Sequence, residues 1–281
     1  MTIDAVLDLL RCPHCAAAFT RDGGVVACAS GHRFDLARQG YLNLLGRRPP
    51  TNADTAAMVA ARYRFLAGGA YAPIAAQLTR TVEAAAGGDV VLDVGAGSGY
   101  YLASVLSQVG GRGVALDISP YAARRAAGAH PQIGAVVADA WGRLPIMEQT
   151  VDVLLSVFAP RHAGEFARVL RPGGLLVVVA PLPDHLVELR QHLGLLEIEP
   201  GKHDRIAETL SRAFTGQPGA ESRYELSLGA DELADLVAMG PNAFHQAPDE
   251  LPRRIAALQQ PAQVTVAVSV TAWRRSPANV E

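Results

Sequence analysis

The 281-residue sequence predicts an α/β fold, a doubly wound and mostly parallel sheet with helices on both faces, preceded by a small metal-binding ribbon. Two observations predict it. From about residue 89 onward, short apolar runs alternate with helical stretches, which is typical of a parallel sheet covered on both sides. The first 46 residues contain all three cysteines of the chain. The runs expected to be strands cover residues 90–94, 113–116, 135–137, 151–158 and 175–180.

The three cysteines stand at a metal-binding spacing. The pattern C-x2-C-x12-C-x3-H is formed by Cys12, Cys15, Cys28 and His32. Three thiolates and one imidazole complete a closed tetrahedral zinc site, so the ion would be structural. Free thiols are the alternative, and an odd cysteine count argues against a disulfide framework. Residues 1–46 are therefore predicted to fold as a zinc ribbon that depends on its metal.

The rest of the chain divides into a connector and a larger domain. Residues 47–88 are predicted to form a helical connector, in which Gly68 and Gly69 separate two helices. Residues 89–281 are predicted to form the sheet domain. Its later elements are expected to be helices near 184–195, 203–214 and 231–238, a loop near the active site at 241–248, and a terminal strand at 263–270. A short helix is expected at residues 3–10.

A glycine-rich loop follows the first expected strand of the larger domain. It has the form G-x-G-x-G after an aspartate, and its residues are Asp93, Gly95, Gly97, Ser98 and Gly99. Glycines at a strand-to-helix turn let the backbone approach a ligand closely, at the edge where open α/β sheets bind ligands. A dinucleotide fingerprint would need its third glycine at the position of Tyr100.

Two more aspartates follow the next strands. Asp117 ends the second strand, where a carboxylate can accept hydrogen bonds from two ribose hydroxyls. Asp139 follows the third strand and could contact an adenine amino group. A single such aspartate could be a solvated loop or cap residue. Acids at three consecutive strand ends favour a nucleoside-binding site.

These motifs, with the Leu170-Arg-Pro-Gly-Gly turn, resemble the class I S-adenosylmethionine-dependent methyltransferases. A narrower resemblance covers nearly the whole chain and is to the RlmA/TlrB family of 23S rRNA guanine-N1 methyltransferases. The segments that carry it are the cysteine ribbon, Gly40-Tyr-Leu-Asn43-Leu-Leu, Tyr71, Phe158-Ala-Pro160, Pro183-Asp-His185-Leu186, Met239-Gly-Pro241 and Phe244-His-Gln. The combination of the ribbon with the Tyr-x-Asn-Leu segment is specific, whereas the glycine loop alone is not.

The resemblance implies a class I methyltransferase fold, S-adenosyl-L-methionine as methyl donor and one structural Zn²⁺. Tyr71, Gly97, Ser98 and Leu186 match cofactor contacts of the family, and His185 matches a position that lines the pocket. The implied reaction is methylation of guanine N1 in the hairpin-35 loop of 23S rRNA. The runs at Phe158 and Met239 favour the branch associated with resistance to macrolides such as tylosin and mycinamicin.

The implied chemistry needs alignment and the loss of a proton. Sulfur, methyl carbon and ring nitrogen must lie in line, and guanine N1 carries a proton at neutral pH. Residues 156–162 are expected beside the methyl group, but His162 is typical of a surface histidine and we assign no base. The guanine must also leave its stack. The aromatic candidates for contact with it are Tyr63, Phe65, Tyr71, Trp141 and Phe244, although Phe65 has the spacing of a core residue.

The first 80 residues are basic, with nine arginines against five aspartates. Arginine pairs well with phosphate oxygens, which suggests an RNA-docking surface. The alternative is a coding bias, since Lys202 is the only lysine of the chain. The arginines of the suggested surface are Arg33, Arg38, Arg47, Arg48, Arg62 and Arg64.

Two other functions fit the same residues. One is a small-molecule methyltransferase in which the zinc is only structural, and the other is a binding module that keeps the cofactor but has no turnover. The sequence has no apolar run of about 18 residues, so we expect a cytoplasmic protein without a membrane partner. A homodimer is also possible, in which two ribbons would form one RNA cleft.

Overall fold

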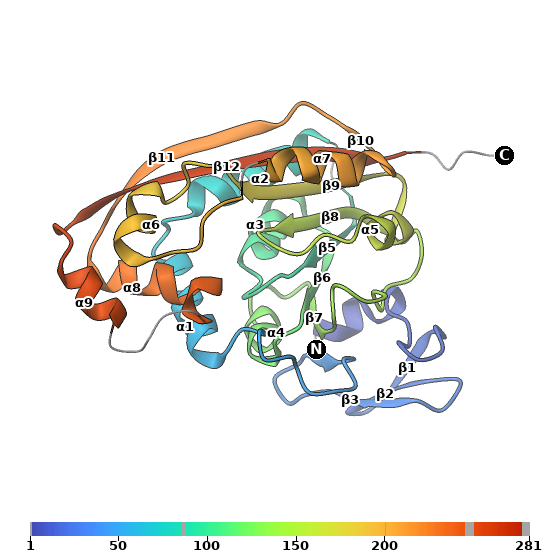
Figure 1. Cartoon of the computed structure of the whole chain (residues 1–281). Coiled ribbons are helices and arrows are strands. Elements are labelled where there is room, and N and C mark those ends of the chain that lie inside the picture. The colour runs from blue at the N-terminus through green and yellow to red at the C-terminus, as the bar shows by residue number, and fades with distance from the viewer. Residues whose placement is uncertain (1, 86–87, 200, 245–249, 277–281) are drawn as a thin grey trace.

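The structure is a computed structural model that describes residues 2–85, 88–199, 201–244 and 250–276. A large mixed sheet forms the centre of the molecule, and a small antiparallel sheet lies at its N-terminal end (Figure 1). Within the described residues the large sheet has the order β10-β12-β9-β8-β5-β6-β7-β4, and β11 pairs with β12. The predicted α/β fold is confirmed.

The parallel part of the sheet contains the five expected strands. They are β5 (Val90–Val94), β6 (Arg112–Asp117), β7 (Ile133–Val137), β8 (Val151–Val157) and β9 (Leu170–Pro181). Leu92 of β5 lies between Val114 of β6 and Leu154 of β8. Every residue of β5, β7 and β8 is buried, because these strands are covered on both faces.

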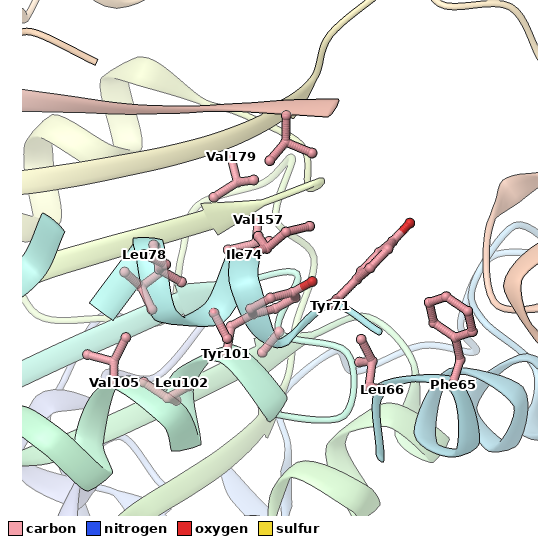
Figure 2. Close-up of a cluster of buried hydrophobic side chains, with 14 of the residues drawn as sticks. Phe65, Leu66, Tyr71, Ile74, Leu78, Tyr101, Leu102, Val105, Val157 and Val179 are labelled. Atoms are coloured by element: carbon pink, nitrogen blue, oxygen red, sulfur yellow. The ribbon is translucent and has the colours of Figure 1, made fainter. Parts of the chain in front are cut away.

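One face of the sheet is covered by helices on either side of the glycine loop. Figure 2 shows part of this apolar cluster, with Tyr71 between Leu66 at the end of α1 and Ile74 in α2. The cluster also contains buried residues of β8 and β9. The helices that contribute to it are α1 (Ala56–Ala67), α2 (Ala72–Ala84), α3 (Tyr100–Val109), α4 (Pro120–Ala126), α6 (Val187–Leu193), α8 (Ala230–Ala238) and α9 (Glu250–Ala256).

The other face is covered partly by α5 (Ala163–Val169) and α7 (Lys202–Ser211), and partly by the N-terminus. In place of the expected helix at residues 3–10, two 3₁₀ turns form, η1 (Thr2–Ala5) and η2 (Leu7–Leu9). Val6 between them packs on β7 at Gly134, where an added Cβ would lie 2.1 Å from the Val6 Cγ2. Only glycine allows this approach, which holds the N-terminus against the sheet.

The small sheet consists of β1 (Phe19–Asp22), β2 (Val25–Cys28) and β3 (Arg33–Asp35) in antiparallel order. The chain then enters the large sheet through β4 (Leu42–Asn43), which pairs in parallel with β7. This two-residue strand has no sequence pattern of its own. It places the following segment next to the carboxyl ends of the parallel strands.

The terminal strand is confirmed as β12 (Ala262–Arg275), which is antiparallel to β9. Two strands that pair with β12 were not predicted, β10 (Phe214–Gly216) and β11 (Ala220–Leu228). β11 alternates between exposed and half-buried residues, and most of them are polar. The expected loop at 241–248 begins with a 3₁₀ turn, η3 (Pro241–Phe244), and its residues 245–248 lie outside the described residues.

Candidate functional site

The four predicted metal ligands lie together in the ribbon. The ligand atoms of Cys12, Cys15, Cys28 and His32 are all within 4.8 Å of one another. The Cys15 and Cys28 sulfurs are 3.6 Å apart, and the Cys28 sulfur is 3.4 Å from His32 Nδ1. Zinc–ligand distances near 2.0–2.3 Å give a tetrahedron with edges of about 3.5–3.8 Å. The spacing therefore fits one tetrahedral zinc ion.

Two tight turns bring these ligands together. In the first, the Ala16 amide donates to the Cys12 carbonyl at 2.8 Å. In the second, the Cys28 amide donates to the His32 carbonyl at 3.0 Å. The pKa of the Cys15 thiol is lowered to about 6, first of all by a hydrogen bond to Ser30. This favours the thiolate form that binds zinc.

A cavity of about 600 Å³ lies at the carboxyl ends of the parallel strands. Three of its lining residues are the predicted acids Asp93, Asp117 and Asp139, which end or follow β5, β6 and β7. The glycine loop and Tyr71 also line it. The structure thus brings together the residues that the sequence places at successive strand ends.

Asp93 has an unusual environment in this cavity. Its side chain is only 1% exposed, and neither carboxylate oxygen has a hydrogen-bond partner. Burial, with a smaller contribution from the charge of Asp117, raises the pKa of Asp93 to about 8. A buried carboxylate without partners is costly, so the cavity favours a ligand that brings a cationic donor to it.

The glycine loop is shaped by close contacts. Gly95 has φ +74°, and a Cβ there would lie 2.6 Å from the Ala159 Cβ after β8. The Gly97 amide donates to Asp117 Oδ2 at 2.8 Å, and the Ser119 amide donates to Asp117 Oδ1 at 2.9 Å. These bonds fix the Asp117 carboxylate, and each oxygen keeps a lone pair for ligand hydroxyls.

Asp139 forms hydrogen bonds with two other residues that line the cavity, one of them in the connector. Its Oδ2 accepts a hydrogen bond from Arg47 at 2.9 Å, and its Oδ1 accepts one from the Trp141 amide at 2.9 Å. Trp141 also lines the cavity, yet its side chain is 65% exposed. An exposed indole at the edge of this cavity is available to stack on a planar ligand.

A second cavity, of about 450 Å³, adjoins the first. Tyr71, Phe158 and Ala159 line both cavities, whereas His185 and Leu186 line only the second. Sequence reasoning missed this division, because the cavity also depends on residues of α8 and of the segment 195–198. The predicted site residues therefore fall into two adjoining pockets, with Tyr71 at the boundary.

His185 is held as a neutral donor. Its Nδ1 accepts a hydrogen bond from the Ala267 amide at 3.2 Å, so the proton of the neutral ring is on Nε2, which lies 3.5 Å from the Tyr71 hydroxyl. Burial lowers the pKa of His185 to about 4. A ring already protonated on Nε2 cannot take a substrate proton there. His162 Nδ1 caps α5 by accepting from the Glu165 amide at 3.2 Å, and His162 lines neither cavity.

The aromatic candidates differ in accessibility. Phe65 is buried in the core, as its spacing predicted, and it meets the Tyr71 ring edge-on. Tyr63 is 47% exposed, with the Arg125 guanidinium 4.1 Å from its ring centroid, and it lines neither cavity. Phe158, not among the candidates, is 41% exposed with φ +53° and lines both cavities. Its segment was expected beside the methyl group, but the positive φ of Phe158 was not.

Some arginines of the suggested RNA-docking surface already form hydrogen bonds within the protein. Arg62 donates to Asp54 and to the Met239 carbonyl, and Arg64 donates to Asp235 at 2.9 Å. Arg33, Arg38 and Arg48 are exposed and form no ion pair with another described residue. The ribbon and the segment after it therefore keep three cations available to an anionic partner.

Comparison with known proteins gives matches to both parts of the chain. A zinc-ribbon model of the RlmA N-terminal region matches residues 10–48, and a methyltransferase-domain model matches residues 91–174. A 23S rRNA (guanine(748)-N(1))-methyltransferase from Streptomyces fradiae is 46% identical over 276 residues, covering 97% of this chain and 99% of the relative. The chain belongs to the 23S rRNA (guanine-N1)-methyltransferase family.

Other relatives agree with this family. A putative 23S rRNA (guanine-N(1)-)-methyltransferase from Micromonospora griseorubida is 46% identical over 96% of this chain and 98% of its own length. Among solved structures, the YcgJ protein from Bacillus subtilis aligns with a TM-score of 0.52 at 17% identity, over 72% of this chain and 99% of that protein. At that identity the structural likeness shows the class I methyltransferase fold alone.

Membership of the methyltransferase family establishes the two cofactors, and the residues present fit both of them. The methyltransferase domain uses S-adenosylmethionine, whose amino group could donate to the orphaned Asp93 carboxylate. The ribbon carries Cys12, Cys15, Cys28 and His32 in position for one zinc ion. In the part of the chain that the structure describes, every helix is too short or too polar to cross a bilayer.

Proposed function

We propose that this methyltransferase transfers the methyl group of S-adenosylmethionine to N1 of a guanine in the hairpin-35 loop of 23S rRNA. The observation that carries the proposal is the likeness over both domains, 46% identity across 99% of a relative whose name gives guanine 748 as its target. The same position is the target we propose here. The joint presence of the ribbon and the methyltransferase domain favours RNA over a small-molecule substrate.

The cofactor would occupy the first cavity. We assign Asp93 to its amino group, Asp117 to its ribose hydroxyls and Asp139 to its adenine amino group. The backbone of the glycine loop, at Gly95, Gly97, Ser98 and Gly99, would follow the ligand closely. Tyr71 would lie beside the methyl group at the boundary with the second cavity, where His185 and Leu186 meet the substrate side of the cofactor.

The target guanine would occupy the second cavity. The shared wall of Tyr71, Phe158 and Ala159 would then bring N1 next to the methyl group. Catalysis by alignment needs the reacting atoms about 3 Å apart. His185 would orient Tyr71 and would not act as base, because its Nε2 already carries a proton. The N1 proton would leave to solvent water.

The ribbon would dock the RNA. We propose the division of the chain into a zinc ribbon at 1–46, a connector at 47–88 and a methyltransferase domain at 89–281. Support comes from Arg33, Arg38 and Arg48, which are free to contact phosphates, and from Arg47, which borders the first cavity. We further propose a cytoplasmic location and a homodimer whose two ribbons form one cleft, which light scattering would test.

Labelled methyl transfer tests the proposed substrate. The purified protein, with radiolabelled S-adenosylmethionine, is given 23S rRNA from a strain that lacks this methylation, and primer extension maps the product, since N1 methylation blocks base pairing. A stop at guanine 748 is expected. RNA with adenine at that position is the matched control. Label in small quinones or polyketides but not in RNA would support the alternative function, and absence of any label would support a binding module.

The same activity would contribute to macrolide resistance. A sensitive host that expresses the protein should tolerate more tylosin or mycinamicin, while a host expressing a variant with alanine at Cys12 and Cys15 should not. Equal growth of both hosts in the presence of the drug would show that the methylation does not contribute to macrolide resistance.

A further inference from the structure

We propose that Arg161 recognises O6 of the target guanine and stabilises the negative charge that reaches this oxygen when N1 loses its proton. The proposal rests on N1 methylation of guanine as the function of the site. It adds a residue that reads the base and takes part in the reaction.

Arg161 differs from the other arginines of the second cavity. Three arginines line it, and two of them have partners. Arg62 donates to Asp54 and the Met239 carbonyl, and Arg190 donates to the Pro183 carbonyl and lies 3.7 Å from Glu197. Arg161 Nη1 is buried without a hydrogen-bond partner. Burial also lowers the pKa of Arg161, as expected of a cation without a nearby carboxylate.

Arg161 is half-buried, and a buried guanidinium N–H group without a partner is costly, so the environment of Nη1 calls for an explanation. A guanidinium carries five donors in a rigid fork and accepts nothing. The missing partner must therefore be an acceptor, and an anionic one would compensate it best. Within the described residues no carboxylate takes this place. An acceptor that arrives with the substrate would supply it.

The position of Arg161 suits a base at the shared wall of the two cavities. Arg161 lies two residues after Ala159, which contacts the glycine loop at Gly95. Phe158 precedes them, and its ring lies at 24° to the His185 ring with centroids 6.1 Å apart. These near-parallel rings offer flat surfaces to a purine. Arg161 lines the same cavity as both rings, so a base resting on them would share that cavity with its guanidinium.

Guanine provides the acceptor through its N1 chemistry. When the N1 proton leaves to water, the electron pair of the N–H bond stays on the base and is shared between N1 and O6. N1 then forms the bond to the methyl carbon, while the carbon–sulfur bond breaks and its electron pair remains on sulfur. A guanidinium at O6 stabilises this anion from the deprotonation to the transition state.

The same contact would select the base. Arginine paired with O6 and N7 is the commonest specific contact to guanine. Adenine carries an amino donor in place of O6 and would point its N–H groups toward the guanidinium. Selection against adenine would then result from an unfavourable contact as well as from a lost bond.

The test compares Arg161→Met with wild type and with Arg212→Met, an exposed arginine that lines neither cavity. Single-turnover methyl transfer to the hairpin is measured from pH 6.5 to 9. Arg161→Met should be about 100-fold slower at pH 7, by analogy with the loss of one oxyanion donor. The deficit should shrink as pH rises, because the medium then removes the N1 proton. Arg212→Met should retain the wild-type rate.

Binding provides a second readout. A hairpin with 2-aminopurine in place of the target guanine lacks O6, and wild type should bind it about tenfold more weakly. Arg161→Met should bind both hairpins alike. The two hairpins also differ at N1, but that difference is the same for both proteins. Comparing wild type with Arg161→Met therefore isolates the contribution of O6. If Arg161→Met does not fold, Arg161→Lys serves instead, keeping the charge but losing part of the preference for guanine.

Two results would overturn the proposal. One is an Arg161→Met enzyme as fast as wild type. The other is a rate deficit that is the same at every pH together with a retained preference for guanine, which would make Arg161 merely structural. A failure of the proposed function shows itself separately, because the wild-type enzyme would then leave the guanine hairpin unmethylated.

Discussion

Replacing Asp93 by asparagine should stabilise the protein at neutral pH while weakening cofactor binding. Asp93 is 1% exposed, both of its oxygens lack partners, and its pKa is raised to about 8. Asparagine keeps the shape but cannot ionise in either the folded or the unfolded chain. The variant thus separates the cost of this carboxylate to the fold from its use in the site.

The difference in the free energy of unfolding between wild type and Asp93→Asn depends on pH. Below about pH 4 Asp93 is protonated in both the folded and the unfolded chain, so ionisation contributes no difference. Between about pH 4 and 8 the unfolded chain releases the proton that the folded chain keeps. Wild type therefore loses stability relative to the variant as pH rises, by at most about 1.4 kcal/mol per pH unit. From pH 6 to 8 the gap should widen by about 2 kcal/mol.

Urea unfolding of the cofactor-free, zinc-bound protein at pH 6, 7 and 8 measures this gap. Asp152→Asn is the matched control, because Asp152 is also buried but accepts from the Val90 amide at 2.9 Å and pairs with Arg171 at 2.7 Å. That variant should lose about 1–3 kcal/mol. Calorimetric affinity for S-adenosylmethionine should fall at least tenfold in Asp93→Asn. A stability gap that does not change with pH would refute the reasoning.

Three further substitutions test the ribbon and the first cavity. Cys28→Ser should lower bound zinc below one ion per chain by atomic absorption, and reduce RNA methylation while cofactor affinity stays; undiminished zinc would exclude Cys28 as a ligand. Gly95→Ala should abolish measurable cofactor binding, since its Cβ would lie 2.6 Å from the Ala159 Cβ, whereas Gly173→Ala, at a similar φ in open space, should cost only about 1 kcal/mol of stability. Trp141→Ala should change thermal stability by less than about 0.5 kcal/mol but weaken cofactor or hairpin binding about tenfold in titrations, and unchanged affinities would remove Trp141 from the site.

The sequence predicts the centre of the fold because its signals are local. Buried parallel strands need nearly continuous apolar runs, and Ile133–Val137 provides one, while only Asp93 interrupts Val90–Val94. Ala220–Leu228 forms a strand by pairing with Ala262–Arg275, although most of its residues are polar. The packing of Val6 on Gly134 depends on residues 128 positions apart, which no local pattern reveals.

The candidate site also has features that local sequence predicts and features that depend on distant segments. Asp93, Asp117 and Asp139 meet because the carboxyl ends of adjacent parallel strands share one edge, so their convergence follows from topology. The ligand spacing of the ribbon is equally local. The second cavity instead depends on distant segments around Tyr71 and His185. That Asp93 and Arg161 have no partners is a property of the packed structure alone.

The most direct measurement is the mass of the nucleosides from one RNA fragment. The protein is incubated with S-adenosylmethionine and unmethylated 23S rRNA, the hairpin-35 fragment is isolated, and its digest is analysed by mass spectrometry against synthetic standards. We expect about one 1-methylguanosine per fragment, at position 748, and none without the protein. Unmodified guanosine throughout the fragment, or a methyl group on another atom or base, would contradict the proposed function.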